Sequence, residues 1–98
     1  MEVDFDDASC ERLEADESYD AGFGREVVRA FRKRLQLIRA APDERDFYAL
    51  KSLHFEKLKG AREGQYSIRL NAQWRLILRF TKREEKKVVV IVAITDYH

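Results

Sequence analysis

The chain has 98 residues and a mass of 11.6 kDa, with 19 basic and 18 acidic side chains. This length excludes two domains, so we expect one domain over residues 1–98. A composition of 45% hydrophobic and 38% charged residues, with one proline, excludes disordered and low-complexity proteins. The net charge of +1 conceals an asymmetry, because residues 1–20 carry −8 and the remaining 78 residues carry +9. We therefore divide the domain into an acidic segment, residues 1–22, and a basic core, residues 23–98.

The residue inventory also excludes several classes of protein. A single cysteine, Cys10, cannot form an internal disulfide or a cysteine-based zinc cluster, and its acidic neighbours make it a poor nucleophile. The longest apolar run, residues 88–94, is far shorter than the roughly 20 residues of a membrane span, and the acidic start is unlike a secretion signal. With His54 and His98 as the only histidines, the sequence predicts a cytoplasmic protein without a metal, a cofactor or a membrane partner.

The first half of the chain predicts a short strand and helices. Residues 3–5 alternate as in a strand, and Ser9 is placed to cap a short helix over residues 10–16. The strongest signal predicts a helix over residues 25–40, whose apolar residues fall in one stripe: Val27, Val28, Phe31, Leu35 and Ile38. After Pro42, Asp43 is placed to cap a short helical turn that reaches residue 50.

The second half has the period of strands. Four strands are predicted, over residues 55–58, 66–70, 74–80 and 88–94, separated by turns at 59–64, 71–73 and 81–87. In residues 74–80 one face is apolar and the other carries Arg75, Ile77 and Arg79, whereas the uninterrupted apolar strand at 88–94 suits the centre of a sheet. The predicted class is α+β, with an N-terminal short strand and two helices packed on a three- to four-stranded antiparallel sheet.

Three groups of side chains could carry chemistry, and a meander of strands can bring them to one exposed face. They are the basic turn Lys57, Lys59 and Arg62, the strand arginines Arg69, Arg75 and Arg79, and the terminal Asp96, Tyr97 and His98. Cations bind phosphates, rings stack on bases and imidazole moves protons near neutral pH, so the set suits RNA. Each group alone is more often a solvated face or a frayed end. Composition and spacing therefore predict only a small basic module with RNA binding as one interpretation.

One longer pattern is more specific. Residues 55–80, FEKLKGAREGQYSIRLNAQWRLILRF, followed by the closing TDYH, resemble the HigB branch of the RelE/ParE superfamily of bacterial toxins, whose pattern is approximately LExLKGxxxGxYSIRINxQWRIxFRW and then xDYH. The resemblance extends over residues 23–98. It implies a RelE-like fold and a metal-independent, ribosome-dependent endoribonuclease that cuts mRNA in the A site. It also implies a HigA-like helix-turn-helix antitoxin as partner, with operator DNA contacted only through that antitoxin.

The resemblance implies functional roles at matching positions, namely Lys59, Arg75, Asp96, Tyr97 and His98. The reaction we expect is attack of a ribose 2′-OH on the adjacent phosphate, which gives a 2′,3′-cyclic phosphate and a 5′-OH. In it His98 transfers a proton, and Glu56 is a second general base. Asp96 orients His98 or holds the neighbouring backbone, and Tyr97 stacks on a base or supplies a hydroxyl. The expected phosphate ligands are Lys57, Lys59, Arg62, Arg69, Arg75 and Arg79. Family members place His or Glu where this chain has Glu56, so the proton-transfer role falls either there or on His54.

Two further expectations concern surfaces. The helix arginines Arg25, Arg29 and Arg32 are predicted to dock on ribosomal RNA, although solvent or the antitoxin covers such a stripe equally well. The acidic segment is expected either to screen the basic face or to help select the antitoxin. Two other functions share this fold, a ParE-like inhibitor of DNA gyrase and a catalytically silent antitoxin-binding module.

Overall fold

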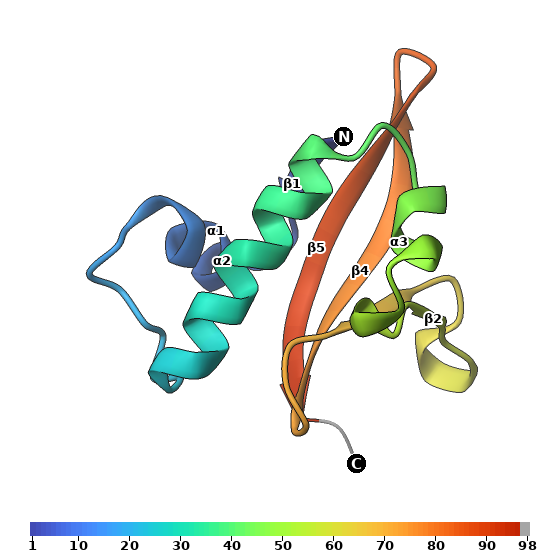
Figure 1. Cartoon of the computed structure of the whole chain (residues 1–98). Helices are drawn as coiled ribbons and strands as arrows, with labels where there is room; N and C mark the ends of the chain where they lie inside the picture. The colour runs from blue at the N-terminus through green and yellow to red at the C-terminus, as the bar shows by residue number, and fades with distance from the viewer. Residues whose placement is uncertain (97–98) are drawn as a thin grey trace.

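The computed structural model describes residues 1–96, which form an α+β domain, as the sequence predicts (Figure 1). Its elements, in chain order, are β1 (Glu2–Phe5), α1 (Ala8–Ala15), α2 (Arg25–Ala40), α3 (Arg45–Ala49), the 3₁₀ turn η1 (Lys51–Leu53), β2 (Glu56–Lys57), the 3₁₀ turn η2 (Gly60–Arg62), β3 (Tyr66–Arg69), β4 (Trp74–Arg83) and β5 (Lys86–Asp96). None of the helices formed by these residues is long and apolar enough to cross a bilayer.

The sheet has five strands in the order β1-β5-β4-β3-β2. The four strands from β2 to β5 are antiparallel, as predicted, and β5 lies inside the sheet between β1 and β4. The short strand predicted at residues 3–5 is confirmed as β1, but its place in the sheet was not predicted: it pairs in parallel with β5 from Glu2 opposite Val88 to Phe5 opposite Ile91. Local sequence could not reveal this pairing, since it joins segments from the two ends of the domain.

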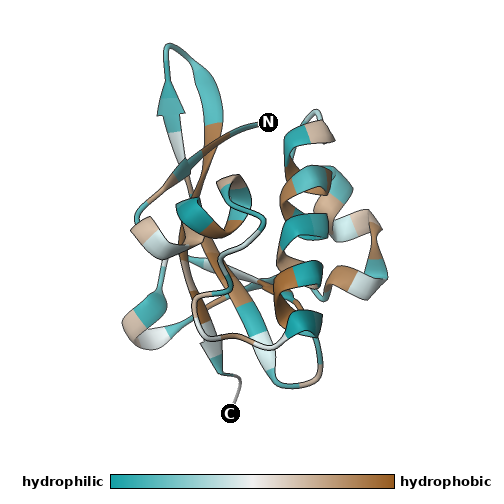
Figure 2. Ribbon diagram, turned by 90° about the vertical axis from the view of Figure 1, so that its left-hand side faces the viewer, coloured by the Kyte–Doolittle hydropathy of each residue, from teal (hydrophilic) through white to brown (hydrophobic). Residues whose placement is uncertain are grey.

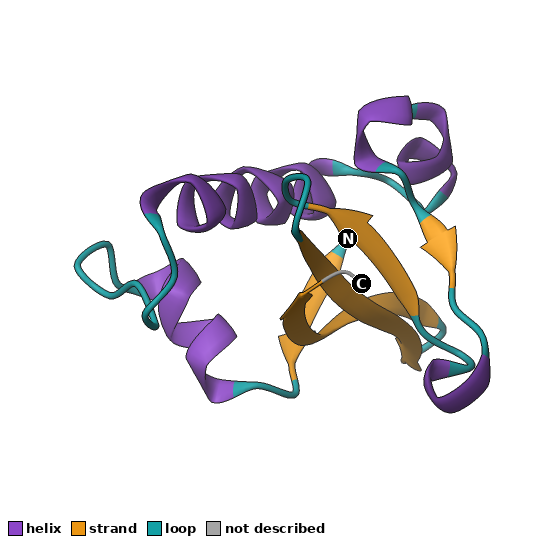
Figure 3. Cartoon of the chain, turned by 90° about the horizontal axis from the view of Figure 1, so that it is seen from below, coloured by secondary structure: helices purple, strands orange, loops and turns teal. Residues whose placement is uncertain are grey.

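Helix α2 lies across one face of this sheet, with α1 near the β1 edge and α3 near the β2 edge (Figure 3). The predicted apolar stripe of α2 is buried, and it packs on inward-facing residues of the sheet that include Ile68, Leu76 and Ile91. Hydrophobic segments gather where α2 meets the central strands, and hydrophilic ones mark the tip of the β4–β5 hairpin (Figure 2). The core therefore lies between the helices and one face of the sheet.

Three local features differ from the sequence prediction. The N-cap of α1 is Asp7 rather than Ser9: its carboxylate accepts hydrogen bonds from the backbone N–H groups of Ser9 and Cys10. The β4–β5 turn is shorter than the predicted 81–87, because Glu84 and Glu85 alone make it with φ values of 51° and 68°. Both strands consequently extend further toward the turn than the apolar runs indicate.

The third difference concerns the face of β4 that was expected to carry exposed arginine. Arg75 is only 6% exposed and Ile77 only 3%. Opposite this stretch β5 contains a bulge, since Ala93 pairs with Ile77 and Ile91 with Leu78. The prediction of an open arginine face was therefore wrong at Arg75, whose side chain is drawn inward by polar partners that the alternation of residues does not reveal.

Candidate functional site

Arg75 lies at the centre of a polar cluster that joins three segments of the chain. Its Nη2 donates to Ser67 Oγ at 2.8 Å and to the carbonyl oxygen of His54 at 2.6 Å, and its Nε donates to Ser67 Oγ at 3.2 Å. Glu56 completes the cluster, with its Oε2 at 3.9 Å from Arg75 Nη2. The sheet register explains the meeting, because Glu56 in β2 stands opposite Ser67 in β3. A buried guanidinium thus holds an exposed carboxylate at the sheet surface.

The two residues that compete for the proton-transfer role occupy different surroundings. His54 is exposed, and its backbone is in the left-handed conformation, with φ 46°. Its carbonyl oxygen accepts a hydrogen bond from Arg75. Its position lines a hollow together with Arg34 and Arg69. Glu56 is also exposed, but its side chain approaches the guanidinium of Arg75 directly. The structure therefore associates Glu56, rather than the imidazole of His54, with the buried arginine.

Asp96 lies on the rung of the sheet next to Arg75. It stands opposite Trp74, whereas Arg75 stands opposite Thr95. Neighbouring rungs face opposite sides of a sheet, and the Trp74 ring packs against Phe23 on the α2 side. Asp96 therefore takes a register position on the face opposite Arg75. Its Oδ2 accepts a hydrogen bond from Gln73 Nε2 at 3.1 Å.

The other two terminal residues of the predicted site, Tyr97 and His98, lie outside the described residues. Arg69, by contrast, is directly opposite Arg75 across β3 and β4, and its Nε donates to the carbonyl oxygen of Asn71 at 3.2 Å. The structure thus brings Arg69, Arg75 and Glu56 to neighbouring register positions.

The basic turn lies at the far edge of the sheet from Asp96. Lys57 in β2 is opposite Tyr66, which is opposite Leu78 in β4, four residues along the strand from Trp74. Three strand spacings across and four residues along correspond to about 20 Å between Lys57 and Asp96. Lys59 and Arg62 follow in the turn, where Arg62 Nη1 donates to Gln65 Oε1 at 3.0 Å. One phosphate cannot reach both the basic turn and the neighbourhood of Asp96. The cations of the turn therefore suit other phosphates along a polynucleotide chain.

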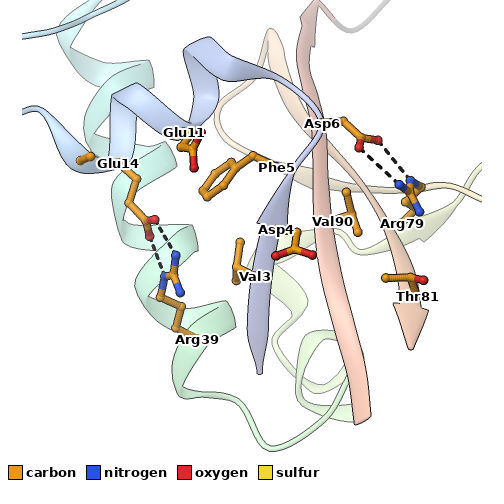
Figure 4. A pocket seen from close by; sticks show the side chains of 11 residues that line it. Val3, Asp4, Phe5, Asp6, Glu11, Glu14, Arg39, Arg79, Thr81 and Val90 are labelled. Carbon is orange, nitrogen blue, oxygen red and sulfur yellow. Dashed lines mark hydrogen bonds and ion pairs between the residues drawn. The ribbon is translucent and has the colours of Figure 1, made fainter. Parts of the chain in front are cut away.

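Arg79 has a partner that the sequence did not indicate. Its Nε lies 3.2 Å from Asp6 Oδ2, immediately after β1. On the other side of β1, Arg39 Nη2 lies 2.6 Å from Glu14 Oε1, so that the strand passes between two ion pairs that border an open hollow of about 540 Å³ (Figure 4). The acidic segment is therefore packed against the basic core and neutralises part of it.

The same edge of the sheet contains a further arginine bound by β1. Arg83 pairs with Glu2 at 3.4 Å and also with Asp4. These carboxylates share a sheet face with the strand arginines, because Glu2 stands opposite Val88 and Asp4 opposite Val90. The predicted phosphate ligand Arg79 thus belongs to an edge where arginines already have carboxylate partners.

The arginines of α2 also divide by their partners. Arg32 donates through Nε to the carbonyl of Leu13 at 2.9 Å and through Nη2 to the carbonyls of Asp16 and Tyr19 at 3.0 and 3.2 Å. A cation that binds the carbonyls at the end of α1 stabilises that helix terminus. Arg32 therefore fastens the acidic segment, in contrast to its predicted role in docking. Arg25 and Arg29 are exposed and line a groove of about 760 Å³.

Cys10 and the acidic groups offer no competing chemistry. Burial raises the pKa of the Cys10 thiol to about 12, with a smaller contribution from the charge of Asp7. The thiol is therefore neutral at physiological pH and a weak nucleophile. Within residues 1–96 no group of three or more His, Cys, Asp or Glu side chains is placed to hold a metal ion.

Two residues of these clusters were missed at the level of sequence. Ser67 could have been found, because the alternation of residues 66–70 places it on the same strand face as Arg69 and, across the sheet, near Arg75. No sequence pattern singled out Arg34, since it is one of several basic residues on α2. It differs from the others in its contact with the end of β3. Its Nε donates to the carbonyl of Arg69 at 3.2 Å.

Comparison with known proteins adds a family and a set of structural relatives. Residues 3–98 match the family model described as RelE-like toxin of type II toxin-antitoxin system HigB. A YoeB/ParE toxin from Agrobacterium tumefaciens has a similar structure, with a TM-score of 0.63 and 20% identity over 100% of both chains. Two structures of YoeB-YefM complexes from Staphylococcus aureus have TM-scores of 0.58 and 0.57, with 20% and 22% identity over 100% of this chain and 97% of theirs. The comparison with curated sequences gives no significant match.

Proposed function

The chain belongs to the HigB-like family of RelE-like toxins from type II toxin-antitoxin systems, and from this premise we propose that it is a ribosome-dependent endoribonuclease that cuts mRNA. The observation that carries the proposal is the pairing of Glu56 with the buried Arg75 at the surface of the sheet. A carboxylate held in place beside a fixed cation supplies a general base for phosphoryl transfer. The cation fixes the position of that base and adds positive charge near the reacting phosphate.

The proposed reaction is an internal transesterification of RNA. Glu56 accepts the proton of a ribose 2′-OH, whose oxygen forms a bond to the adjacent phosphorus. The bond from phosphorus to the 5′-oxygen of the next nucleotide breaks, and His98 donates a proton to that oxygen. The products are a 2′,3′-cyclic phosphate and a 5′-OH, with no change in oxidation state. Asp96 and Tyr97 are assigned to orienting the terminal imidazole and stacking on a base.

Arg75 acts in this scheme through Glu56. It is 6% exposed, and its Nε and Nη2 are engaged with Ser67 and the His54 carbonyl. We therefore assign it as a positioning residue that fixes the base against the sheet, in place of the direct phosphate ligand that the sequence predicted. His54 is assigned a supporting role, since its carbonyl orients Arg75.

The remaining cations are assigned to the RNA chain on either side of the cut. Lys57 lies about 20 Å from Asp96 by the sheet register, and Lys59 and Arg62 follow it in the turn, so these cations would contact phosphates several nucleotides away. Arg25 and Arg29, exposed on α2, are assigned to ribosomal RNA. Such contacts weaken with salt as counterions are released.

The proposed partner is a HigA-like antitoxin with a helix-turn-helix domain, through which alone the toxin would reach operator DNA. The printed descriptions of the Staphylococcus aureus structures name complexes with YefM, which supports the capacity of this fold to bind an antitoxin. Ribosomes and mRNA as targets place the proposed activity in the cytoplasm.

Primer extension on cellular mRNA after brief induction tests the proposal against its alternatives. Cuts phased with codons support the nuclease. DNA damage without mRNA cuts would instead indicate a ParE-like gyrase inhibitor, and the absence of both would indicate a silent antitoxin-binding module.

Two variants test the assigned groups on programmed ribosomes. Glu56→Gln and deletion of His98 should each lower the cleavage rate by about 10² to 10⁴-fold, the usual contribution of a general acid or base. Glu63 is also exposed and lies in the neighbouring turn, so the matched neutralisation Glu63→Gln should cleave at the wild-type rate. Full-rate cleavage by either of the first two variants would overturn the assignment of that residue.

A further inference from the structure

A hollow beside the β3–β4 turn contains two arginines whose charge has no carboxylate partner. The hollow has a volume of about 510 Å³ and is lined by residues of α2, of η1 and its end, and of the β3–β4 turn: Glu26, Arg34, Ser52, His54, Arg69, Leu70, Asn71 and Ala72. Within residues 1–96 no carboxylate oxygen lies within 4.0 Å of the guanidinium nitrogens of Arg34 or Arg69. This sets the hollow apart from the β1 edge, where Arg39, Arg79 and Arg83 are all paired.

Both arginines are held in place without being neutralised. Arg34 Nε donates to the carbonyl of Arg69, and Arg69 Nε donates to the carbonyl of Asn71, each at 3.2 Å. Both side chains are partly buried. Among the described residues neither guanidinium makes another hydrogen bond, so the terminal nitrogens of both are open to a ligand. A partly buried cation without a counter-charge is costly to the free protein, and an anion that binds there relieves that cost.

We infer that this hollow is an anion subsite that takes a backbone phosphate of RNA, with Arg34 as its principal ligand. A guanidinium whose Nε is anchored to a carbonyl loses little freedom when its remaining N–H groups bind the oxygens of a phosphodiester. Ser52 and Asn71 add polar groups to the walls of the hollow. The inference rests on the proposed function for the identity of its ligand, since the site by itself specifies an oxyanion.

The position of the hollow fits a phosphate near the cut. His54 lines the hollow and also binds Arg75 through its carbonyl. The turn that forms the opposite wall continues into Gln73, whose amide donates to Asp96. The subsite is therefore linked to Arg75 through His54 and to Asp96 through the β3–β4 turn. A phosphate in the hollow would fix the RNA beside the reacting nucleotide.

Binding of a 2′-O-methyl RNA oligonucleotide tests the subsite without any cleavage. Fluorescence anisotropy of the full chain over a series of KCl concentrations gives both the affinity and its salt dependence. Arg34→Gln should lower affinity at low salt by about three- to tenfold and reduce the salt slope by about 0.7, the value for one phosphate of a single strand. Arg45→Gln is the matched control, since it removes the same charge at an exposed site paired with Asp43.

A second variant acts in the opposite direction and guards against loss of folding. Glu26 is the carboxylate that lines the hollow, so Glu26→Gln should raise RNA affinity while leaving the arginines in place. Arg34→Lys should recover part of the affinity lost in Arg34→Gln, because it restores the charge but not the two-pronged geometry.

The outcomes separate the subsite from the proposed function. A lower slope for Arg34→Gln alone, together with tighter binding by Glu26→Gln, supports the subsite even if the wild-type protein fails to cut mRNA on ribosomes. Equal slopes for Arg34→Gln and Arg45→Gln would overturn the subsite even if cleavage is observed. Unchanged RNA binding by Arg34→Gln with weaker antitoxin binding would also overturn it, because the hollow would then receive an acidic side chain.

Discussion

The arginines of two regions, the β1 edge of the sheet and the β3–β4 turn, differ in their partners. At the β1 edge, Arg79 and Arg83 are paired with carboxylates of the acidic segment, and Arg39 is paired with Glu14 beside it. At the β3–β4 turn, the partners of Arg34 and Arg69 within residues 1–96 are backbone carbonyls. The difference teaches that a net charge of +1 conceals an uneven surface, in which arginines near β1 are neutralised locally and those near the β3–β4 turn are not. The positive field that remains is concentrated where the proposed RNA site lies.

The acidic segment, residues 1–22, has a structural role in addition to its charge. Because β1 is hydrogen-bonded to β5 and Arg32 binds carbonyls of α1 and the following loop, the segment is part of the fold rather than an appendage. Removing it would take away an edge strand along with its charge. Screening by its carboxylates is therefore best tested by substitution of side chains rather than by truncation.

The largest expected effect tests whether the acidic segment stays packed against the core. The reporter is Cys10, a buried residue of α1 within that segment. A pKa of about 12 instead of 9.0 lowers the thiolate fraction at pH 8 by about 10³-fold. Iodoacetamide should therefore label the native protein about 10³ times more slowly than the chain unfolded in guanidinium chloride. Rapid labelling of folded protein would mean that the acidic segment opens locally, which would break the comparison.

The same thiol predicts a dependence of stability on pH. The raised pKa means that the folded state keeps its proton where the unfolded state has lost it. The contribution is therefore full below about pH 9 and is lost as the pH rises toward 12. Cys10→Ala should flatten the decline in stability over that alkaline range, as measured by urea unfolding.

The next effect concerns the buried arginine of the proposed site. Arg75→Met removes the donors to Ser67 and to the His54 carbonyl and leaves both groups without this partner. We expect a loss of about 3 kcal/mol in the free energy of unfolding, measured by urea denaturation. Arg45→Met, at an exposed site, should leave the unfolding midpoint unchanged. A fully stable Arg75→Met protein would contradict the positioning role.

A smaller effect tests the neutralised edge directly. Asp4→Asn combined with Asp6→Asn removes the carboxylate partner of Arg79 and one of the two carboxylate partners of Arg83. RNA affinity at low salt should therefore rise by about three- to tenfold. Stability should change by less than about 1 kcal/mol, because exposed ion pairs contribute little. Glu17 is an exposed acid of the same segment that makes no ion pair with the basic core within residues 1–96, so Glu17→Gln is the control. An equal gain from the control would show a general charge effect rather than pairing at this edge.

The smallest expected effect concerns the β4–β5 turn, which lies outside both regions compared above. Replacing Glu84 and Glu85 by Asn-Gly, which suits two consecutive positive φ values, should raise the free energy of unfolding by about 1 kcal/mol. Replacing both by glutamine removes the same charges without easing the backbone, and it should give no such gain in thermal unfolding. A stabilisation shared by both variants would point to charge repulsion in the hairpin instead.

Sequence reasoning succeeded where the signal is local. The apolar stripe of α2 and the strand pattern from residue 66 onward follow from periods that neighbouring residues display, and the structure confirms both. It failed where partners come from distant segments. The parallel pairing of β1, the carboxylates that bind Arg79 and the burial of Arg75 depend on contacts between residues far apart in the chain. The role of Arg34 likewise depends on a carbonyl in another element.

The place of β5 in the sheet has a consequence for the order of folding. This strand, Lys86–Asp96, separates β1 from β4, so the first strand of the domain has no neighbour until the last one has been synthesised. During translation α1 and α2 emerge early, but the sheet on which they pack can close only when β5 leaves the ribosome. Contacts between residues so distant in sequence form slowly. A nascent toxin would therefore lack the assembled face proposed to bind RNA for as long as the ribosome that makes it still holds β5.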